Sequence, residues 1–305
     1  MADNRLVGRF APSPTGRMHA GNIFAALMSW LIVKSRGGSI VLRIEDLDVE
    51  RSKRSFAEHA MRDFEFLGLT WDEGPYYQQG REEAYEEAYR TLCEKGEVYP
   101  CFCTRADLHA ASAPHRGVKL VYAGTCRGLS EAEVRHRSQE RAPAWRLQVP
   151  DSVYSIDDLV QGTFSQNLLH DCGDFIVRRS DGLFAYQLAV VVDDAEQGVN
   201  CVVRGMDLLV STPQQMYLQD LIGAGRCEYA HVPLIVGERD RRLSKRDRDA
   251  GIEELCTRFG SAAGVIGHIA WLVGLQECDE PVTPEQLLEG FRIPDFPDKV
   301  QIQWM

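Results

Sequence analysis

The stretch GRFAPSPTGRMHAGN, residues 8–22, decides the fold of this chain. It begins with a short apolar strand pattern that runs into two prolines, and proline ends a strand because it has no backbone N–H to donate. A helical pattern, AGNIFAALMSWLIVKSR, follows directly over residues 20–36 and is stopped by two glycines. The tight junction between strand and helix carries an unusual set of polar side chains: Arg9, Ser13, Thr15, His19 and Asn22.

Strand and helix patterns continue to alternate after this junction. SIVLRIEDLD, residues 39–48, is typical of a strand with an acidic end, and residues 51–68 have the spacing of an amphipathic helix. Such alternation predicts a parallel sheet with right-handed crossovers, in which ligands bind at the carboxyl ends of the strands. Residues 9–22 and IEDLD, residues 44–48, both fall at such ends, which is the first indication of a functional site.

The residues of the junction suit a bound phosphate. Gly21 lies just inside the predicted helix start, where unpaired backbone N–H groups attract anions. His19 and Asn22 are three residues apart and share one face of the first turn, and Arg9 could pair with a carboxylate or phosphate. The alternative is a proline-rich loop with a solvated histidine. The glycine pattern of dinucleotide-binding folds and the Walker lysine motif are both absent from the sequence.

A second cluster is RLSKR, residues 242–246, in a short basic segment after the predicted strand HVPLIVGERD, residues 231–240. A lysine on a mobile loop can follow a triphosphate from the ground state to the transition state. Taken alone, a run of charges is most often a solvated surface. Lys245 becomes informative when it is paired with the histidine-containing junction.

The organisation of the chain changes after the first hundred residues. DFIVRRSDGLFAYQLAVVVDD, residues 174–194, predicts a hairpin through residues 180–182 followed by a core strand. Residues 199–209 predict another strand, and residues 211–225 predict a helix capped by Ser211 or Thr212. We therefore expect four units: the first half of a catalytic domain (1–98), a turn-broken insertion (99–180), the second half of the catalytic domain (181–248) and a helical region (249–305).

The net charge and the distribution of apolar residues exclude several classes of protein. A formal net charge of −11 excludes an all-over basic nucleic-acid coat and argues against a membrane-surface role, although a local basic groove could still bind RNA. The sequence does not open on a signal-peptide pattern. Its longest apolar-rich stretch, residues 23–34, is far shorter than the roughly 20 residues that cross a bilayer. We expect a cytoplasmic protein that has no membrane partner.

Nine cysteines in a chain without a secretory signal indicate metal ligands or buried thiols rather than disulfides. Cys101 and Cys103 lie close together and Cys126 could fold back on them, which gives three soft ligands for Zn²⁺, an ion that prefers four in a tetrahedron. His115 and Tyr122 are both candidates for the fourth ligand, and a phenol needs the charge of the metal to lose its proton. The alternative is three reduced cysteines with no metal.

APSPTGRMHAGN, residues 11–22, together with RLSK, residues 242–245, resembles the two signatures of class I aminoacyl-tRNA synthetases. RFAPSPTG, RIEDLD and the insertion resemble, more narrowly, the glutamyl group of that family, and the resemblance covers about residues 5–260. It implies an α/β fold: a Rossmann-like parallel sheet catalytic domain, an inserted zinc-binding subdomain and a short C-terminal helical region. The second signature is a variant, because Arg242 stands where the family often has lysine.

The resemblance also implies a reaction and the residues that serve it. The substrate's own carboxylate attacks the α-phosphate of ATP, which is accompanied by Mg²⁺, and no protein nucleophile takes part. The implied catalytic residues are His19, Asn22 and Lys245, and the implied contacts to ATP add Gly21, Arg242 and Ser244. The implied glutamate pocket is formed by Arg9, Ser13, Glu45, Tyr186 and Arg204.

The residue types of this implied pocket also suit the charged groups of glutamate. The two arginines suit the side-chain carboxylate of glutamate, Glu45 suits its ammonium group and Tyr186 adds a hydroxyl. The alternatives are that Glu45 simply pairs with Arg43 and that Tyr186 belongs only to the core. Asp193 and Asp194 could belong to the site as well, or could merely end the predicted strand.

The chain ends 60 residues after Lys245, so we expect no anticodon-binding domain of the kind that full glutamyl enzymes carry. With its cysteine pattern, this architecture resembles the glutamyl-queuosine branch of the group, which implies Tyr122 as the fourth ligand of a structural zinc. The implied partners are ATP, L-glutamate and the anticodon stem-loop of tRNA(Asp), whose queuosine base receives the glutamate, and a monomer is expected. The alternatives are a truncated enzyme that charges a tRNA 3′ end and a catalytically silent RNA-binding module.

Overall fold

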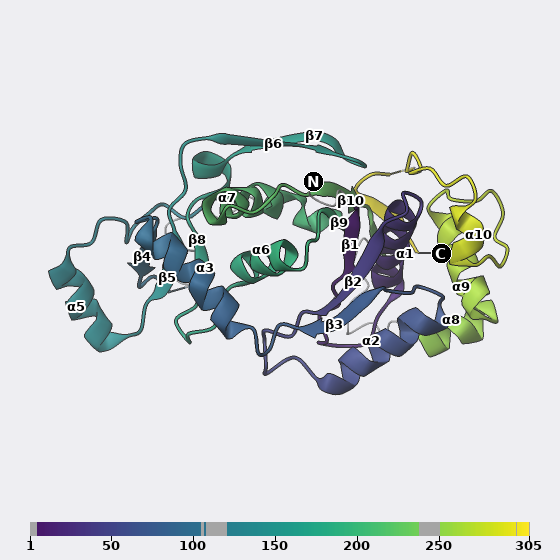
Figure 1. Ribbon diagram of the computed structural model, residues 1–305, viewed down its shortest axis with the longest axis horizontal. Coiled ribbons are helices and arrows are strands. Elements are labelled where there is room, and N and C mark those ends of the chain that lie inside the picture. The colour runs from purple at the N-terminus through teal and green to yellow at the C-terminus, as the bar shows by residue number, and fades with distance from the viewer. Residues whose placement is uncertain (1–4, 105–106, 108–120, 238–250, 297, 305) are drawn as a thin grey trace.

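The computed structural model describes residues 5–104, 107, 121–237, 251–296 and 298–304. The elements of the first half of the chain are β1 (Val7–Phe10), α1 (Ala20–Lys34), β2 (Ser39–Ile44), α2 (Arg54–Phe66), β3 (Glu73–Tyr77), α3 (Glu82–Glu94), β4 (Val98–Cys101), α5 (Glu131–Glu140), β5 (Ala144–Leu147) and β6 (Val153–Asp158). Those of the second half are β7 (Gly162–Asn167), η1 (Leu168–Cys172), β8 (Phe175–Arg178), α6 (Tyr186–Glu196), β9 (Cys201–Gly205), η2 (Met206–Ser211), α7 (Thr212–Ile222), β10 (Glu228–Val232), β11 (Leu234–Val236), α8 (Ile252–Phe259), α9 (Ala262–Leu272), α10 (Pro284–Leu288) and β12 (Gln301–Gln303). The molecule is elongated, with α5 at one end and α8–α10 at the other (Figure 1).

The central strands are parallel, as the alternation of strands and helices predicts. β1 pairs with β2, and β2 pairs with β3, both in parallel. β9 and β10 form a second parallel pair, which is joined to β1 through Asn200: its backbone N–H donates to Val7 O at 3.0 Å, and its side chain accepts from Val7 N at 2.8 Å. The carboxyl ends of β1, β2 and β9 therefore open toward one side, where ligands bind in sheets of this kind.

Helix α1 fixes the junction between β1 and α1, residues 11–19. Eleven of its 15 residues are buried, which is typical of a helix with apolar contacts on all sides. It packs against β1 and β9 as well as the C-terminal part of the chain, where the ring of Phe24 meets that of Phe296 edge to face at 5.9 Å. Because the helix is held along its whole length, its first turn is a rigid platform at the end of β1.

The segment Tyr186–Asp194 is a helix, α6, so the prediction of a core strand there is wrong. The hairpin before it is confirmed: Arg179 N donates to Leu183 O at 2.8 Å, and Arg178 pairs with Phe184. A short apolar run that is buried throughout has the same appearance in a strand and in a buried helix, and three consecutive valines favoured the strand. α6 is buried because α3 and α7 pack against it around a second hydrophobic core.

The insertion contains β4, β5 and β8, which form an antiparallel sheet, and a hairpin made of β6 and β7 (Figure 1). The strand predicted over residues 231–240 is divided between β10 and β11 up to Val236, because Pro233 cannot continue the hydrogen-bond ladder, and residues 238–240 lie outside the described residues. The predicted helix over residues 211–225 is confirmed as α7, with Ser211 at its N-cap position.

The C-terminal region is helical through α8, α9 and α10, as predicted, but it also contains a strand that the sequence pattern does not reveal. β12 pairs in parallel with β11, so that Gln301 lies opposite Leu234. Three residues are too few to give a recognisable alternation of apolar and polar positions. Among the described helices, none combines the length and the apolar composition needed to cross a bilayer.

Candidate active site

A cavity of about 530 Å³ opens at the carboxyl ends of β1 and β9. Every residue of the predicted glutamate pocket lines it, and so do the predicted phosphate contacts at the start of α1. The predicted contacts Arg242, Ser244 and Lys245 lie outside the described residues. The predicted residues that the fold gathers around this one cavity are Arg9, Ser13, His19, Gly21, Asn22, Glu45, Tyr186 and Arg204.

His19 is the N-cap of α1, and its ring is oriented by the helix that it caps. Its Nδ1 accepts a hydrogen bond from Gly21 N at 3.2 Å. In the opposite direction, Asn22 Oδ1 accepts from His19 N at 3.1 Å. Burial lowers the pKa of His19 below its ordinary value, which favours the neutral ring. A neutral imidazole whose Nδ1 accepts must carry its proton on Nε2, which leaves Nε2–H free to donate to a phosphate oxygen.

Gly21 keeps this arrangement open. A Cβ atom at this position would lie 3.1 Å from Cε1 and 3.2 Å from Nδ1 of the His19 ring, closer than such contacts usually come. The ring would have to shift by a few tenths of an ångström, which would disturb its hydrogen bond to Gly21 N. The glycine therefore leaves room for the His19 ring in the position that caps the helix.

The two arginines of the cavity differ in how their charge is balanced. Arg9 Nε lies 3.4 Å from Asp194 Oδ1, and Arg9 Nη1 donates to Val203 O at 3.3 Å. Arg204 is buried, and its hydrogen bonds to described residues go to the neutral groups of His231 and Thr212. In the part of the chain that the structure describes, no carboxylate oxygen lies within ion-pair distance of Arg204, so its buried charge is unbalanced.

Glu45 and Tyr186 line the cavity from two different elements. Glu45 follows β2, and Tyr186 lies in the first turn of α6. Glu45 does pair with Arg43, at 3.3 Å, and this pairing leaves the carboxylate on the wall of the cavity. Burial raises the pKa of Glu45, while Arg43 and Arg9 act in the opposite direction. Burial and the neighbouring Glu45 raise the pKa of Tyr186, so its hydroxyl keeps its proton and can donate.

Asp193 and Asp194 do not end a strand; they lie on α6 and neutralise the cations beneath the cavity. Arg43 is fully buried, and its Nη1 donates to Asp194 Oδ1 at 2.8 Å. Asp193 accepts from Arg81 Nε at 2.7 Å and from Gln78 Nε2 at 2.7 Å. Sequence reasoning left their role open because the partners are more than 100 residues away in the chain. The only signal was two adjacent charges at the end of an apolar run.

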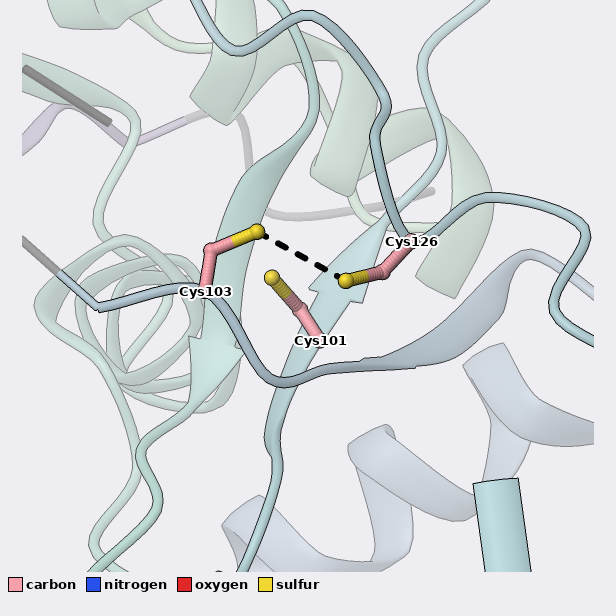
Figure 2. Close-up of side chains that lie close together, drawn as sticks. All are labelled: Cys101, Cys103 and Cys126. Carbon is pink, nitrogen blue, oxygen red and sulfur yellow. Dashed lines mark hydrogen bonds between the residues drawn. The ribbon is translucent and has the colours of Figure 1, made fainter. Parts of the chain in front are cut away.

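The three predicted cysteine ligands come together in the insertion. The Sγ atoms of Cys101, Cys103 and Cys126 all lie within 4.8 Å of one another, and Cys103 and Cys126 are 3.6 Å apart (Figure 2). Tyr122 Oη lies 3.4 Å from Cys101 Sγ and 3.8 Å from Cys103 Sγ, and it accepts from Cys126 N at 2.9 Å. Tetrahedral zinc with thiolate ligands separates its sulfur atoms by roughly 3.8 Å, so these residues fit the ion. The other candidate ligand, His115, lies outside the described residues.

A buried arginine stands beside this cluster. Arg146 Nε donates to Cys101 Sγ at 3.2 Å, and its guanidinium lies 3.8 Å from the centre of the Tyr122 ring. Burial alone would raise the pKa of the Cys101 thiol, but hydrogen bonds to Tyr122 and Arg146 lower it below its ordinary value. Burial raises the pKa of Tyr122. The phenol therefore needs a bound cation to lose its proton, whereas the Cys101 thiol loses its proton more readily than an ordinary cysteine.

A second cavity, of about 780 Å³, lies between the first cavity and the cysteine cluster. It shares Ser13, Glu45 and Tyr186 with the first cavity, and it reaches Cys101 and Cys103. Its walls also carry cationic side chains from several elements: Arg51, Arg141, Arg146 and Arg179. A molecule that occupies it would therefore contact both the pocket floor and the insertion.

The parallel sheet, the capped helix start and the charged pocket are together those of a class I aminoacyl-tRNA synthetase. The family model for tRNA synthetases class I (E and Q), catalytic domain, matches residues 5–274. Among solved structures, a glutamate tRNA ligase from Elizabethkingia meningosepticum, crystallised in complex with its amino acid, superimposes with a TM-score of 0.80. The two sequences are 25% identical, and the match covers 99% of this chain and 67% of that one.

Curated relatives narrow the assignment further. The glutamyl-Q tRNA(Asp) synthetase of Symbiobacterium thermophilum is 43% identical over 97% of this chain and 96% of its own length. That of Neisseria meningitidis serogroup C is 46% identical over 92% of both chains. The chain belongs to the glutamyl-Q tRNA(Asp) synthetase family, and the resemblance noted from its motifs is confirmed.

Proposed function

We propose that this chain activates L-glutamate with ATP and transfers the glutamyl group to the queuosine base in the anticodon loop of tRNA(Asp). The observation that carries the choice of amino acid is the unbalanced charge of Arg204, which is buried in the wall of the cavity beside the start of α1. A buried cation is costly unless an anion meets it, and the side-chain carboxylate of glutamate would do so. The names of the relatives support the choice of RNA.

The activation step needs positioning rather than a protein nucleophile. The α-carboxylate of glutamate attacks the α-phosphorus of ATP, a mixed anhydride forms and the bond to pyrophosphate breaks. His19 Nε2–H and the positive end of the α1 dipole would attract phosphate oxygens, together with Asn22 and, from the segment outside the described residues, Arg242, Ser244 and Lys245. Mg²⁺ bound with the nucleotide would supply further charge neutralisation.

Glutamate would lie between Arg204 and Glu45. Arg9 and Arg204 would receive its side-chain carboxylate, Glu45 its ammonium group, and Tyr186 and Ser13 would add hydroxyl contacts. Glu45 accepts from Arg43 on one side only, so a second oxygen remains for the ammonium group. We expect the α-carboxylate to face the start of α1, where the phosphates of ATP would bind.

The second cavity is the proposed entrance for the RNA. It adjoins the glutamate pocket through Ser13, Glu45 and Tyr186, and the arginines on its walls suit a phosphate backbone.

The proposal includes a monomer, because both cavities are lined by a single chain, and a cytoplasmic location, where tRNA and ATP are found. We also retain the division into residues 1–98, 99–180, 181–248 and 249–305 as a working description of the domains.

The likeness to a glutamate tRNA ligase favours a second candidate, glutamylation of a tRNA 3′ end. The two are separated by incubating the protein with labelled glutamate, ATP and queuosine-containing tRNA(Asp) whose terminal adenosine has neither a 2′ nor a 3′ hydroxyl. We expect label on this RNA and none on the same tRNA without queuosine. Label only on tRNA with an intact 3′ end would establish the second candidate instead. Absence of glutamate-dependent ATP–pyrophosphate exchange would indicate the catalytically silent module.

We further propose that Cys101, Cys103, Tyr122 and Cys126 hold a structural zinc ion. The support is the spacing of the three sulfur atoms (Figure 2) and the position of the Tyr122 hydroxyl near two of them. Zinc bound there would tie the end of β4 to the segment that precedes α5. Arg146 would offset part of the negative charge of three thiolates and a phenolate.

Replacing Cys101 by serine is expected to lower the zinc content well below the roughly one ion per chain of a structural site. Because the ion would stabilise the insertion and not the reacting groups, glutamate-dependent exchange should fall by less than about threefold, while proteolysis within residues 101–140 accelerates. Metal analysis, exchange assays and limited proteolysis measure the three quantities. Cys278→Ser, at an exposed cysteine, is the control. Loss of adenylate formation with unchanged zinc content would contradict the structural role.

A further inference from the structure

Behind Arg204 lies a fully buried histidine that no predicted role accounts for. His231, on β10, has no solvent exposure, and its Nε2 accepts from Arg204 Nε at 3.0 Å. On the other side of the ring, Nδ1 lies 2.6 Å from Asp158 Oδ2, at the end of β6. Thr212, the first residue of α7, completes the set by accepting from Arg204 Nη2 at 2.8 Å.

The donors and acceptors fix the protonation of this histidine. Arginine can only donate, so Nε2 of His231 must carry a lone pair, and the proton of a neutral ring must be on Nδ1, where it is donated to Asp158. Burial, opposed by the hydrogen bond to Asp158, lowers the pKa of His231, which agrees with a neutral ring. The facing groups are Asp158 from β6, Arg204 from β9, Thr212 from α7 and the stacked ring of Tyr229 on the same strand.

These contacts determine the orientation of the guanidinium. Two anchors, His231 at Nε and Thr212 at Nη2, fix both the plane and the rotation of a flat group. None of the described residues accepts a hydrogen bond from the remaining nitrogen, Nη1, and Arg204 lines the cavity. The edge that carries Nη1 is therefore available to a ligand, in an orientation set by atoms outside the cavity.

Asp158 also has a purely structural task. Its Oδ1 accepts from Val160 N at 3.0 Å and Gln161 N at 2.9 Å, which closes the turn of the β6–β7 hairpin. Replacing Asp158 would therefore disturb the hairpin whatever its relation to the pocket. The contact between His231 and Arg204 is the one that can be tested without disturbing that turn.

We propose that His231, oriented by Asp158, is a positioning residue that presents Arg204 to the acidic side chain of the substrate and thereby sets the preference for glutamate over glutamine. This inference rests on the proposed function of the cavity. It assigns to an outer hairpin of the insertion, β6–β7, a part in amino-acid selection, since the order of contacts runs from Asp158 through His231 to Arg204. His231 itself touches no substrate.

Two substitutions at the same position separate positioning from packing. The amide of glutamine reaches the place of Nε2 and can accept from Arg204, whereas the amide of asparagine reaches only the place of Nδ1 and keeps the bond to Asp158. We expect His231→Asn to raise the KM for glutamate in ATP–pyrophosphate exchange by roughly tenfold or more, the usual effect of losing a hydrogen bond to a charged group. His231→Gln should raise it by less than about threefold. The KM for ATP should be unchanged in both, and the preference for glutamate over glutamine should fall only in His231→Asn.

Thr212→Val provides an independent measurement in case His231→Asn does not fold. It removes the acceptor for Arg204 Nη2 while leaving the bond between His231 and Asp158 in place, and it should also raise the KM for glutamate without changing that for ATP. Equal glutamate KM values for His231→Asn and His231→Gln, or a wild-type value for Thr212→Val, would overturn the positioning role. An unmutated protein that exchanges pyrophosphate without dependence on glutamate would instead refute the proposed function, and this inference with it.

Discussion

Replacing Arg204 by methionine is expected to raise the KM for glutamate by roughly a hundredfold or more, because truncating one partner of a buried charge pair commonly costs 2–5 kcal/mol. The guanidinium has hydrogen bonds to His231 and Thr212 but, among the residues that the structure describes, no carboxylate to balance it. In the proposed complex, the substrate supplies that carboxylate. Methionine has a similar length without the charge, so the pocket would keep its shape and lose its cation.

The same substitution should leave the protein folded. The two lost hydrogen bonds destabilise the fold, while the removal of an unbalanced buried charge has the opposite effect, so the free energy of unfolding should change by less than about 1 kcal/mol. Exchange kinetics at varied glutamate, together with urea unfolding, measure both effects. Arg226→Met is the matched control, because Arg226 is half-exposed and pairs with Asp220 on the surface at 2.6 Å. A glutamate KM near the wild-type value in Arg204→Met would mean that the substrate carboxylate binds elsewhere.

The largest loss of stability is expected from Asp193→Asn. Asp193 has no solvent exposure and accepts from Arg81 and Gln78 at 2.7 Å and from Tyr85 at 3.0 Å. An amide there would turn one acceptor into a donor that faces other donors, and it would remove one of the carboxylates that balance Arg43. Breaking a buried ionic network from one side costs about 3–5 kcal/mol in free energy of unfolding.

Urea unfolding measures this change, and Glu196→Gln is its control. Glu196 also pairs with Arg81, at 2.7 Å, but its side chain is about half exposed, and a surface pair of this kind contributes at most about 1 kcal/mol. The two variants remove the same charge one helical turn apart. Similar stabilities for the two variants would show that the network beneath the cavity does not hold α6 in place.

The sequence predicts most of the catalytic sheet because its signals there are local. Two prolines follow β1 and end it. The polar junction and the apolar-rich run after it predict α1. The signals fail where burial removes periodicity: residues 188–194 of α6 are all buried, so neither a period of two nor one of 3.6 residues is visible in Tyr186–Asp194. The packing of α3 and α7 around α6 decides the question, and it cannot be read from the segment itself.

The candidate site divides in a similar way. Arg9, His19 and Glu45 belong to short motifs, so their side chains could be named before the structure was known. The role of Asp194 stayed open, because its partner Arg43 is 151 residues away in the chain. His231 was not a candidate, because a single histidine in an apolar strand gives no sign that it contacts Arg204. Motifs give the groups that meet the ligand, and the tertiary fold gives those that orient them.

The pairing of β11 with β12 bears on how the protein is made. β11 precedes the segment that contains Lys245, and its partner strand comes 65 residues later, with bonds from Leu234 N to Val300 O at 3.0 Å and from Trp304 N to Val236 O at 2.8 Å. During translation, β1 and β2 can pair soon after they leave the ribosome, whereas β11 lacks the one partner strand that it has among the described residues until residue 303 has been synthesised. The strand that leads toward the segment containing Lys245 therefore gains its partner strand only at the very end of synthesis.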